Sequence, residues 1–157
     1  MTPEVETQSS ESQSTQELLD TSTPIDLVEE IETVIASMAQ DQKVMFAHSE
    51  AGYFWKFQYG SVQVFVQLTG TGDEDTLSVW SFVLDLPAKN EPQLMRKLLE
   101  MNWLSTYEAR FAIVDDRVVV LSNRTVADIN PSEISQAITI VATLADDNDE
   151  LLQAEYK

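Results

Sequence analysis

A tight hairpin of aromatic and aliphatic residues, YFWKFQYGSVQVFVQL at positions 53–68, constrains the fold of this chain more than any other stretch. Aromatic residues alternate along its first half and aliphatic residues along its second half, which is the period of a half-buried β-strand. Gly60-Ser61 separates the halves, and glycine at the first central position of a two-residue loop suits a type II′ turn. This turn predicts four pairs on one core face: Tyr53 with Leu68, Trp55 with Val66, Phe57 with Val64, and Tyr59 with Val62.

The opposite face of this hairpin carries lysine, glutamine and serine, with Phe54 and Phe65 as exceptions. The third predicted strand, 77–86, is apolar on both parities. We assign its Trp80, Phe82 and Leu84 to the core. The other parity then faces the same way as Phe54 and Phe65, and it contains Leu77, Val79 and Val83.

An outward apolar surface of this size is larger than a monomer usually exposes. We therefore predict a partner or dimer surface formed by Phe54, Phe65 and Val79. A loop or the second helix of the same chain could cover these side chains instead. If the parity of the third strand is reversed, Trp80 and Phe82 take the place of Val79.

Three segments have the pattern of capped amphipathic helices. The first begins at Thr23-Pro24 and continues with apolar residues at helical spacing to Met38. The second follows Asn90 and ends near Leu104, and the third follows Asn130-Pro131 with Glu133 at the capping-box position.

Strands are also predicted at 44–48, 109–114 and 118–126, with Phe111 opposite Val120 and Ile113 opposite Val118. Counted without the short candidate at 44–48, the order is α-β-β-β-α-β-β-α. It predicts an α+β domain in which an antiparallel sheet carries the first and last helices on one face.

The chain of 157 residues has a formal net charge of −18, from 27 acidic and 9 basic residues. This charge should repel nucleic acid and anionic membranes, so neither is expected as a partner. Residues 1–22 hold five acidic residues and no basic one, which predicts a disordered acidic tail ahead of a single domain at 23–157. The sequence has no cysteine, no long apolar run and no signal-peptide pattern, as expected of a cytoplasmic protein.

The residues that could be catalytic or could bind a metal lack the sequence motifs that these functions require. His48 is the only histidine, and no nucleophile motif accompanies it. Asp73, Glu74 and Asp75 lack the spacing of a calcium loop, and no phosphate-binding loop follows the glycines. The acidic run 146–150 is interpreted as a solvated or fraying helix end. We therefore predict no catalytic residue, no metal site and no cofactor.

One segment resembles a known family. A helix ending in Leu99-x-x-Asn102, a strand around Phe111, a turn at Asp115-Asp116, a strand at 118–121 and a helix start at Asn130-Pro131 are similar to those of the YbjN family. The resemblance covers about residues 25–155. It implies a fold like that of type III secretion chaperones and a dimer-forming module with a chaperone-like or regulatory role. It implies no catalytic residue.

The favoured function is therefore a non-enzymatic, small acidic homodimer that binds another protein. Two alternatives stay open: an acidic decoy for a basic nucleic-acid-binding protein, and an uncharacterised hydrolase built from Asp, Glu and Ser.

Overall fold

The computed structural model describes residues 25–157, so the predicted tail and the helix start at Thr23-Pro24 lie outside the described residues. The elements are α2 (Leu27–Met38), a short 3-10 turn η1 (Gln40–Gln42), β1 (Val44–Ser49), β2 (Gly52–Tyr59), β3 (Val62–Leu68), β4 (Thr76–Asp85), α3 (Glu91–Leu104), β5 (Arg110–Val114), β6 (Arg117–Thr125) and α4 (Pro131–Tyr156). The α+β class and the antiparallel sheet are confirmed. The order is α-β-β-β-β-α-β-β-α, with one strand more than predicted, because the short candidate at 44–48 also forms a strand, β1.

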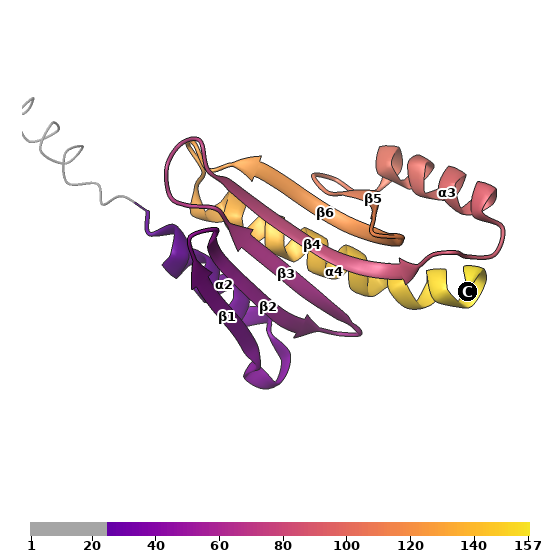
Figure 1. Ribbon diagram of the computed structural model, residues 1–157, viewed down its shortest axis with the longest axis horizontal. Helices are drawn as coiled ribbons and strands as arrows, with labels where there is room; N and C mark the ends of the chain where they lie inside the picture. Colours follow the sequence, from indigo (N-terminus) through magenta and orange to yellow (C-terminus); the bar gives the residue numbers. More distant parts are fainter. Residues whose placement is uncertain (1–24) are drawn as a thin grey trace, which may run out of the picture.

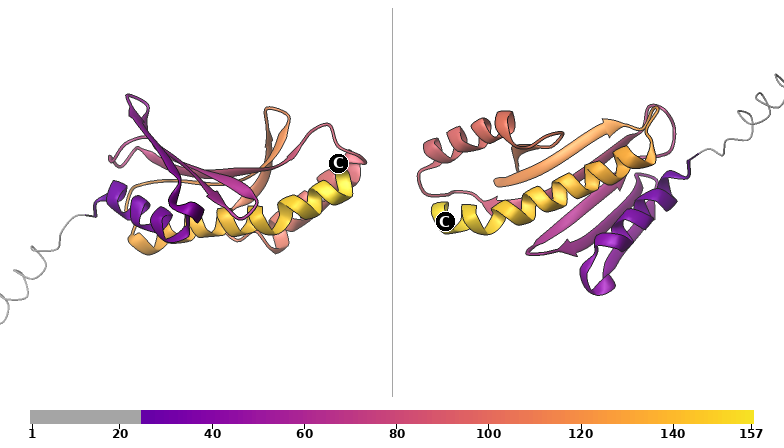
Figure 2. Two further views of the ribbon diagram at one scale, coloured as in Figure 1. Left: turned by 90° about the horizontal axis from the view of Figure 1, so that it is seen from below. Right: turned by 180° about the vertical axis from the view of Figure 1, so that it is seen from behind.

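All six strands join one antiparallel sheet in the order β1-β2-β3-β4-β6-β5. The helices α2 and α4 lie on one face of this sheet, as predicted, and the main core fills the space between them and the strands (Figure 1). Helix α3 lies at one end, next to β5. No helix of residues 25–157 lies on the other face of the sheet, which is concave because the strand ends turn away from α4 (Figure 2).

The predicted register of the β2–β3 hairpin is confirmed at all four core pairs. Gly60 has φ of 56°, which side chains with a Cβ adopt only at a cost. A Cβ at this position would also overlap the carboxylate of Asp146 on α4. Glycine is therefore required both by the turn and by the approach of α4. In the second hairpin, Phe111 pairs with Val120 as predicted, and the turn residues Asp115 and Asp116 have positive φ.

The parity assigned to the third strand was wrong. Val79 is fully buried in the core, with Leu77 and Val83, because it pairs with Val66 of β3 on the face covered by α4. Trp80 therefore points to the open face. Ser81, which shares the parity of Val79, is also buried, and its hydroxyl donates to the Gln63 carbonyl at 2.7 Å.

A β-bulge between Phe82 and Leu84 inserts one extra residue into β4 and so reverses which alternate residues face the core beyond it. Leu84 is consequently buried, as predicted, whereas Phe82 lies on the open face. The irregularity leaves the Val83 carbonyl available to an α4 side chain, and Gln153 donates its amide to it at 3.3 Å.

Two of the three predicted helix starts need correction. Helix α2 is capped by Asp26, whose carboxylate accepts the Glu29 N–H at 3.1 Å, three residues beyond the predicted Thr23. Asn90 precedes α3 but makes no side-chain cap, since its amide bonds to the Gln93 side chain.

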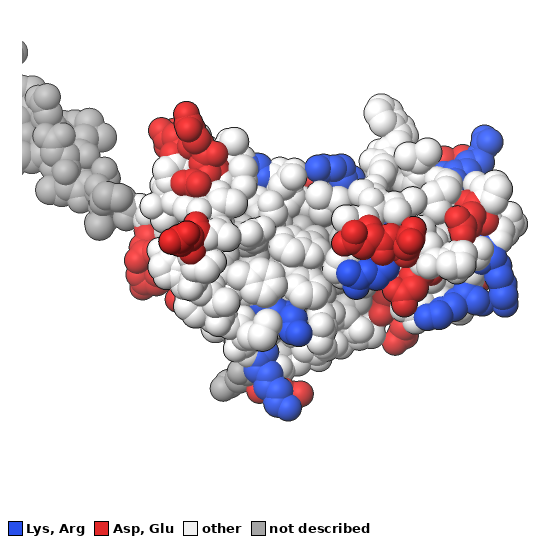
Figure 3. Space-filling model, viewed as in Figure 1, with Lys and Arg blue, Asp and Glu red and all other residues white. Residues whose placement is uncertain are grey.

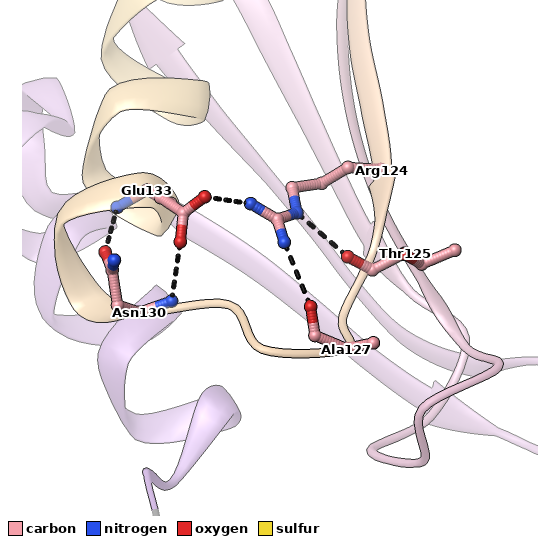
Figure 4. A network of polar contacts seen from close by, with 5 residues as sticks. All are labelled: Arg124, Thr125, Ala127, Asn130 and Glu133. Carbon is pink, nitrogen blue, oxygen red and sulfur yellow. Dashed lines mark hydrogen bonds and ion pairs between the residues drawn. The ribbon is translucent and has the colours of Figure 1, made fainter.

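The start of α4 is a capping box, as predicted. The Asn130 side chain accepts the Glu133 N–H at 2.8 Å, and the Glu133 carboxylate accepts the Asn130 N–H at 3.1 Å. Arg124 from the end of β6 forms an ion pair with the same carboxylate and donates to the carbonyls of Thr125 and Ala127 (Figure 4). This network joins the end of strand β6 to the first turn of the longest helix.

Candidate functional site on the open face of the sheet

Four aromatic rings from three strands meet on the open face of the sheet, where they are half-buried. Phe65 of β3 stacks on Trp80 of β4, with ring centroids 5.6 Å apart and an interplanar angle of 13°. Phe54 lies 6.1 Å from Phe65 and 6.2 Å from Trp80. Phe82 meets Phe65 edge-on at 5.9 Å. These are favourable aromatic geometries, and the four rings together are called the aromatic face below.

The sequence predicted part of this surface. Phe54 and Phe65 lie together as expected, whereas Val79 does not belong to the surface and Trp80 and Phe82 replace it. This is the arrangement expected for the reversed parity of the third strand. No loop or helix of residues 25–157 covers the aromatic face (Figures 1 and 2).

A hollow of about 490 Å³ extends the aromatic face towards β6 and β5. Its walls include Trp80 and Phe82, and the remaining lining is Gln67, Ser78, Val79, Ala112, Val114, Asp115, Val119 and Leu121. Figure 3 shows this side of the molecule as a broad uncharged area, with Lys, Arg, Asp and Glu side chains around its border. The hollow is therefore suited to apolar groups.

Two cations adjoin the aromatic face. Lys56 of β2 lies opposite Phe65 in the strand register, and Arg117 of β6 contacts Phe82. The Arg117 guanidinium is 3.6 Å from the centroid of Phe82, which is close enough for a cation–π contact. Arg117 lies opposite Asp85 of β4 in the strand register. This places a donor-rich group beside the rings without making the surface strongly basic.

His48 lies on the opposite side of the sheet, on the edge strand β1. Its ring stacks on Tyr53 of β2 with centroids 4.1 Å apart and an interplanar angle of 6°. Phe46 and Trp55 extend the same aromatic row, and Trp55 donates its indole N–H to Glu32 of α2 at 3.3 Å. This packing gives His48 a structural role in joining β1 to β2.

The acidic run near the C-terminus is solvated only in part: Asp147 and Glu150 are exposed, as predicted, whereas Asp146 and Asp149 are not free in solvent. Asp146 and Asp149 lie inside α4, and Asp149 is only 4% exposed. Both carboxylates reach Ser61 at the tip of the β2–β3 hairpin: Asp146 accepts the Ser61 N–H at 2.9 Å, and the Ser61 hydroxyl lies 2.7 Å from Asp149. The helical spacing of Ala145, Asp149 and Leu152 could have indicated that Asp149 faces inward.

Two hydrogen bonds between the Asn102 side chain and the Phe111 backbone fix α3 to the edge strand β5, and they are called the Asn102 clip below. The Asn102 amide donates to the Phe111 carbonyl at 3.2 Å and accepts the Phe111 N–H at 2.8 Å. A primary amide offers this donor and acceptor side by side, so asparagine pairs with the strand as a neighbouring strand would.

Sequence reasoning missed a second exposed apolar surface, on α3. The side chains of Leu99, Trp103 and Leu104 face outward, and Leu94 and Leu98 face the core. The signal in the sequence is that the apolar residues of α3 are too many for one helix face.

The last turn of α4 contains one perturbed titratable group. Tyr156 is 2% exposed, and burial raises the pKa of its hydroxyl above the ordinary value of 10.0. The neighbouring Glu155 carboxylate adds to this rise, while the Lys97 ammonium, 5.8 Å from the Tyr156 ring centroid, opposes it.

The remaining predicted features concern loops. Asp75 closes the β3–β4 loop by accepting from the Thr69 hydroxyl at 3.0 Å and the Gly72 N–H at 2.9 Å, and Asp73 and Glu74 are exposed. Within residues 25–157, no group of three or more His, Asp or Glu side chains is arranged to hold a metal ion. No helix in this range is both long enough and apolar enough to cross a membrane.

Comparisons with known proteins agree with this architecture. Residues 27–154 match the YbjN family, described as "Putative bacterial sensory transduction regulator". No curated protein matches the sequence. A chain from the crystal structure of the ExsC–ExsE complex is similar with a TM-score of 0.57 and 16% identity, over 82% of this chain and 97% of that chain. The fold is thus the one predicted, similar to that of a type III secretion chaperone.

Proposed function

This chain belongs to the YbjN family, and we propose that it is a non-enzymatic, chaperone-like or regulatory module that binds another protein. We further propose that it acts in the cytoplasm as a small acidic homodimer. The likeness to a chain of a two-protein complex supports the binding role at the level of the fold.

The aromatic face is the observation that carries this proposal. Two helices shield the other side of the sheet, but Phe54, Phe65, Trp80 and Phe82 meet solvent on a concave, largely uncharged surface. Burying apolar area releases about 25 cal/mol per Å², and aromatic and arginine side chains dominate protein interfaces. Arg117 beside Phe82 supplies hydrogen-bond donors at the border of this surface.

The occupant that fits best is an apolar segment of a different protein. The hollow of about 490 Å³ is open along the sheet, so it can take side chains of an extended or helical segment. A nucleic acid does not fit, because the chain has a net charge of −18 and its basic residues form no continuous stripe on this face.

The test is affinity purification of the full-length chain from its own cells, followed by titration of the recovered protein in purified form. Phe65→Glu combined with Trp80→Glu should abolish binding, because it puts two carboxylates into the contact. Leu151→Glu, at a 65% exposed apolar position of α4, is the matched control and should bind normally. Equal affinity of both variants for the partner would refute the proposal.

The non-enzymatic role has its own test. Any activity found in the pure protein that falls when one carboxylate is changed would overturn this part of the proposal. Binding partners that are all basic and are lost at modest salt would instead favour the acidic decoy.

A further inference from the structure

Basic side chains are unevenly divided between the two sides of the sheet. Helix α2 contains three acidic residues and α4 six, and neither helix contains a lysine or an arginine. On the open face, Lys43 and Lys56 line a hollow of about 560 Å³ next to Met45, and Arg117 contacts Phe82. The open face is therefore the side of the sheet to which an acidic segment is attracted.

The cations of the open face are balanced by carboxylates only in part. Asp85 lies opposite Arg117, and Asp115 lines the hollow beside the rings. Lys56, in contrast, has apolar residues of β1 and β3 as its neighbours in the strand register. An acidic group that approaches the rings therefore meets an ammonium group that neither register neighbour neutralises.

The 24 residues that precede the described part of the chain have the complementary chemistry. They include five acidic residues and no basic one. Residues 17–20 read Glu-Leu-Leu-Asp and contain the only two adjacent aliphatic side chains of this stretch. An apolar centre with an acid on each side thus matches the aromatic face, which has Lys56 on one side and Arg117 on the other.

The length of chain before Ile25 allows residues 17–20 to reach the rings. Figure 1 shows α2 beginning at the same end of the sheet as β4. Trp80 lies four residues into β4, about 13 Å from that end. Leu18 lies seven residues before Ile25, and an extended chain of that length spans about 23–25 Å. This covers the distance along β4 and leaves about 10 Å, one layer of the fold, for the passage round the end of the sheet.

The spacing of the charges agrees as well. The Arg117 guanidinium lies over Phe82, which is two residues beyond Trp80 on β4. Trp80 and Lys56 are aligned across β3 in the strand register, so Phe82 and Lys56 are about 12 Å apart. In an extended segment the first and last of residues 17–20 are about 10 Å apart. Both acids then approach a cation while the two leucines lie on the rings.

We infer that residues 17–20 bind the aromatic face of the same molecule and cover it until a partner takes their place. The inference rests on the proposed function, because it concerns the regulation of the same surface. A tethered segment has an effective concentration on the order of 1 mM. A contact with a dissociation constant of about 0.1 mM is then about nine-tenths formed, and it lowers the apparent affinity for a partner about tenfold.

The first test locates the segment by nuclear magnetic resonance in the full-length chain. The sequence has no cysteine, so Gln16→Cys carries a nitroxide label at one position only. The label should broaden the indole N–H resonance of Trp80. It should not affect that of Trp103 on α3, at the end of the sheet away from α2 (Figure 1). Equal effects on the two indoles, or no effect on Trp80, would overturn the inference.

Two variants and a mixture control this measurement. Leu18→Ser with Leu19→Ser in the labelled chain should remove the broadening, because the apolar contact is lost without a change of charge. Val5→Ser removes an aliphatic side chain elsewhere in the same stretch and should leave the broadening as it is. In a mixture, labelled chains should not broaden Trp80 of unlabelled, isotope-enriched chains. Broadening between molecules assigns the contact to a second copy and refutes the inference.

The second test measures how far the aromatic face is covered. The probe is the dye anilinonaphthalene sulfonate, which binds exposed apolar surface and is titrated into the full-length chain. Leu18→Ser with Leu19→Ser should bind the dye about tenfold more tightly than Val5→Ser does, because a covering contact of the strength given above is lost. Adding Phe65→Glu and Trp80→Glu should remove this gain. Equal dye affinities of the Leu18-Leu19 and Val5 variants would contradict the inference.

The outcomes separate this inference from the proposed function. If the label broadens Trp80 but Phe65→Glu with Trp80→Glu keeps the partner bound, the contact within the chain stands and the proposed partner surface fails. If these substitutions abolish partner binding but the label leaves Trp80 unchanged, the proposed function stands and the inference fails.

Discussion

The hydroxyl oxygen of Ser61 lies 2.7 and 2.8 Å from the two carboxylate oxygens of Asp149, 88 residues further along the chain. Asp149 is buried in α4, and Ser61 lies at the tip of the hairpin that the sequence marks most strongly. The contact therefore fixes the position of the β2–β3 hairpin on the longest helix.

We expect Ser61→Ala to lower the free energy of unfolding by about 1–3 kcal/mol, because it leaves a buried acceptor without its donor. Urea denaturation measures this, with Ser132→Ala in the exposed first turn of α4 as the control. Adding Asp149→Leu removes the buried acceptor and should recover part of the loss. A Ser61→Ala midpoint equal to that of the control would show that the contact contributes nothing.

Val79 and Trp80 are neighbours on opposite faces of β4, and the same substitution should affect them very differently. Val79→Glu places a carboxylate in the core and should cost about 3–5 kcal/mol or unfold the chain. Trp80→Glu places it on the half-exposed aromatic face and should leave a folded, cooperative protein. Thermal melts by circular dichroism distinguish the two. A less stable Trp80→Glu than Val79→Glu would contradict the observed parity.

We expect Asn102 to stabilise the fold because its amide supplies both a donor and an acceptor to Phe111, and not only because it is polar. Asn102→Ala removes both hydrogen bonds to Phe111 and should cost about 1–2 kcal/mol. Asn102→Asp can still accept from the Phe111 N–H, but it loses the donor to the carbonyl, so we expect it to restore part of the stability at most. Hydrogen exchange at the Phe111 amide is the direct readout, with Asn148→Ala on α4 as a control.

Alkaline pH should destabilise the fold through Tyr156. In the unfolded chain its hydroxyl loses its proton near pH 10, whereas burial raises the folded pKa above this value. The contribution of Tyr156 is therefore fully present below pH 10 and is lost as pH rises towards the folded pKa. Tyr156→Phe should remove this part of the pH dependence in urea titrations.

The exposed Tyr107 provides the control, since Tyr107→Phe should leave the alkaline slope as it is in the wild type. An unchanged slope in Tyr156→Phe would mean that other groups cause the alkaline loss.

Local patterns were sufficient for much of the fold. The hairpin around Gly60 and the capping box at Asn130 combine turn or cap residues with a clear apolar period, and both formed as predicted. The start of α2 differs from the prediction because Asp26 is itself a capping residue, and its carboxylate accepts the Glu29 N–H.

The aromatic face was predicted only in part, for reasons that are tertiary. β4 is apolar on both parities, and the buried Ser81 gave its true core parity a polar appearance. Its hydrogen bond to the Gln63 carbonyl, which makes burial tolerable, depends on pairing with β3. Leu84 is buried only because the bulge precedes it. Its correct assignment to the core was therefore consistent with the wrong assignment of Trp80 and Phe82. Asp149 was misjudged similarly, since its partner Ser61 is far away in the sequence.

The Asn102 clip also limits how this sheet can aggregate. The N–H and C=O of Phe111 point away from β6, so they would otherwise offer a free strand edge to a neighbouring chain. In a strand of five residues, occupying this position leaves only Ile113 with both groups directed outward. Open-ended association of sheets needs two free strand edges on each molecule. The Asn102 side chain therefore blocks it on the β5 side.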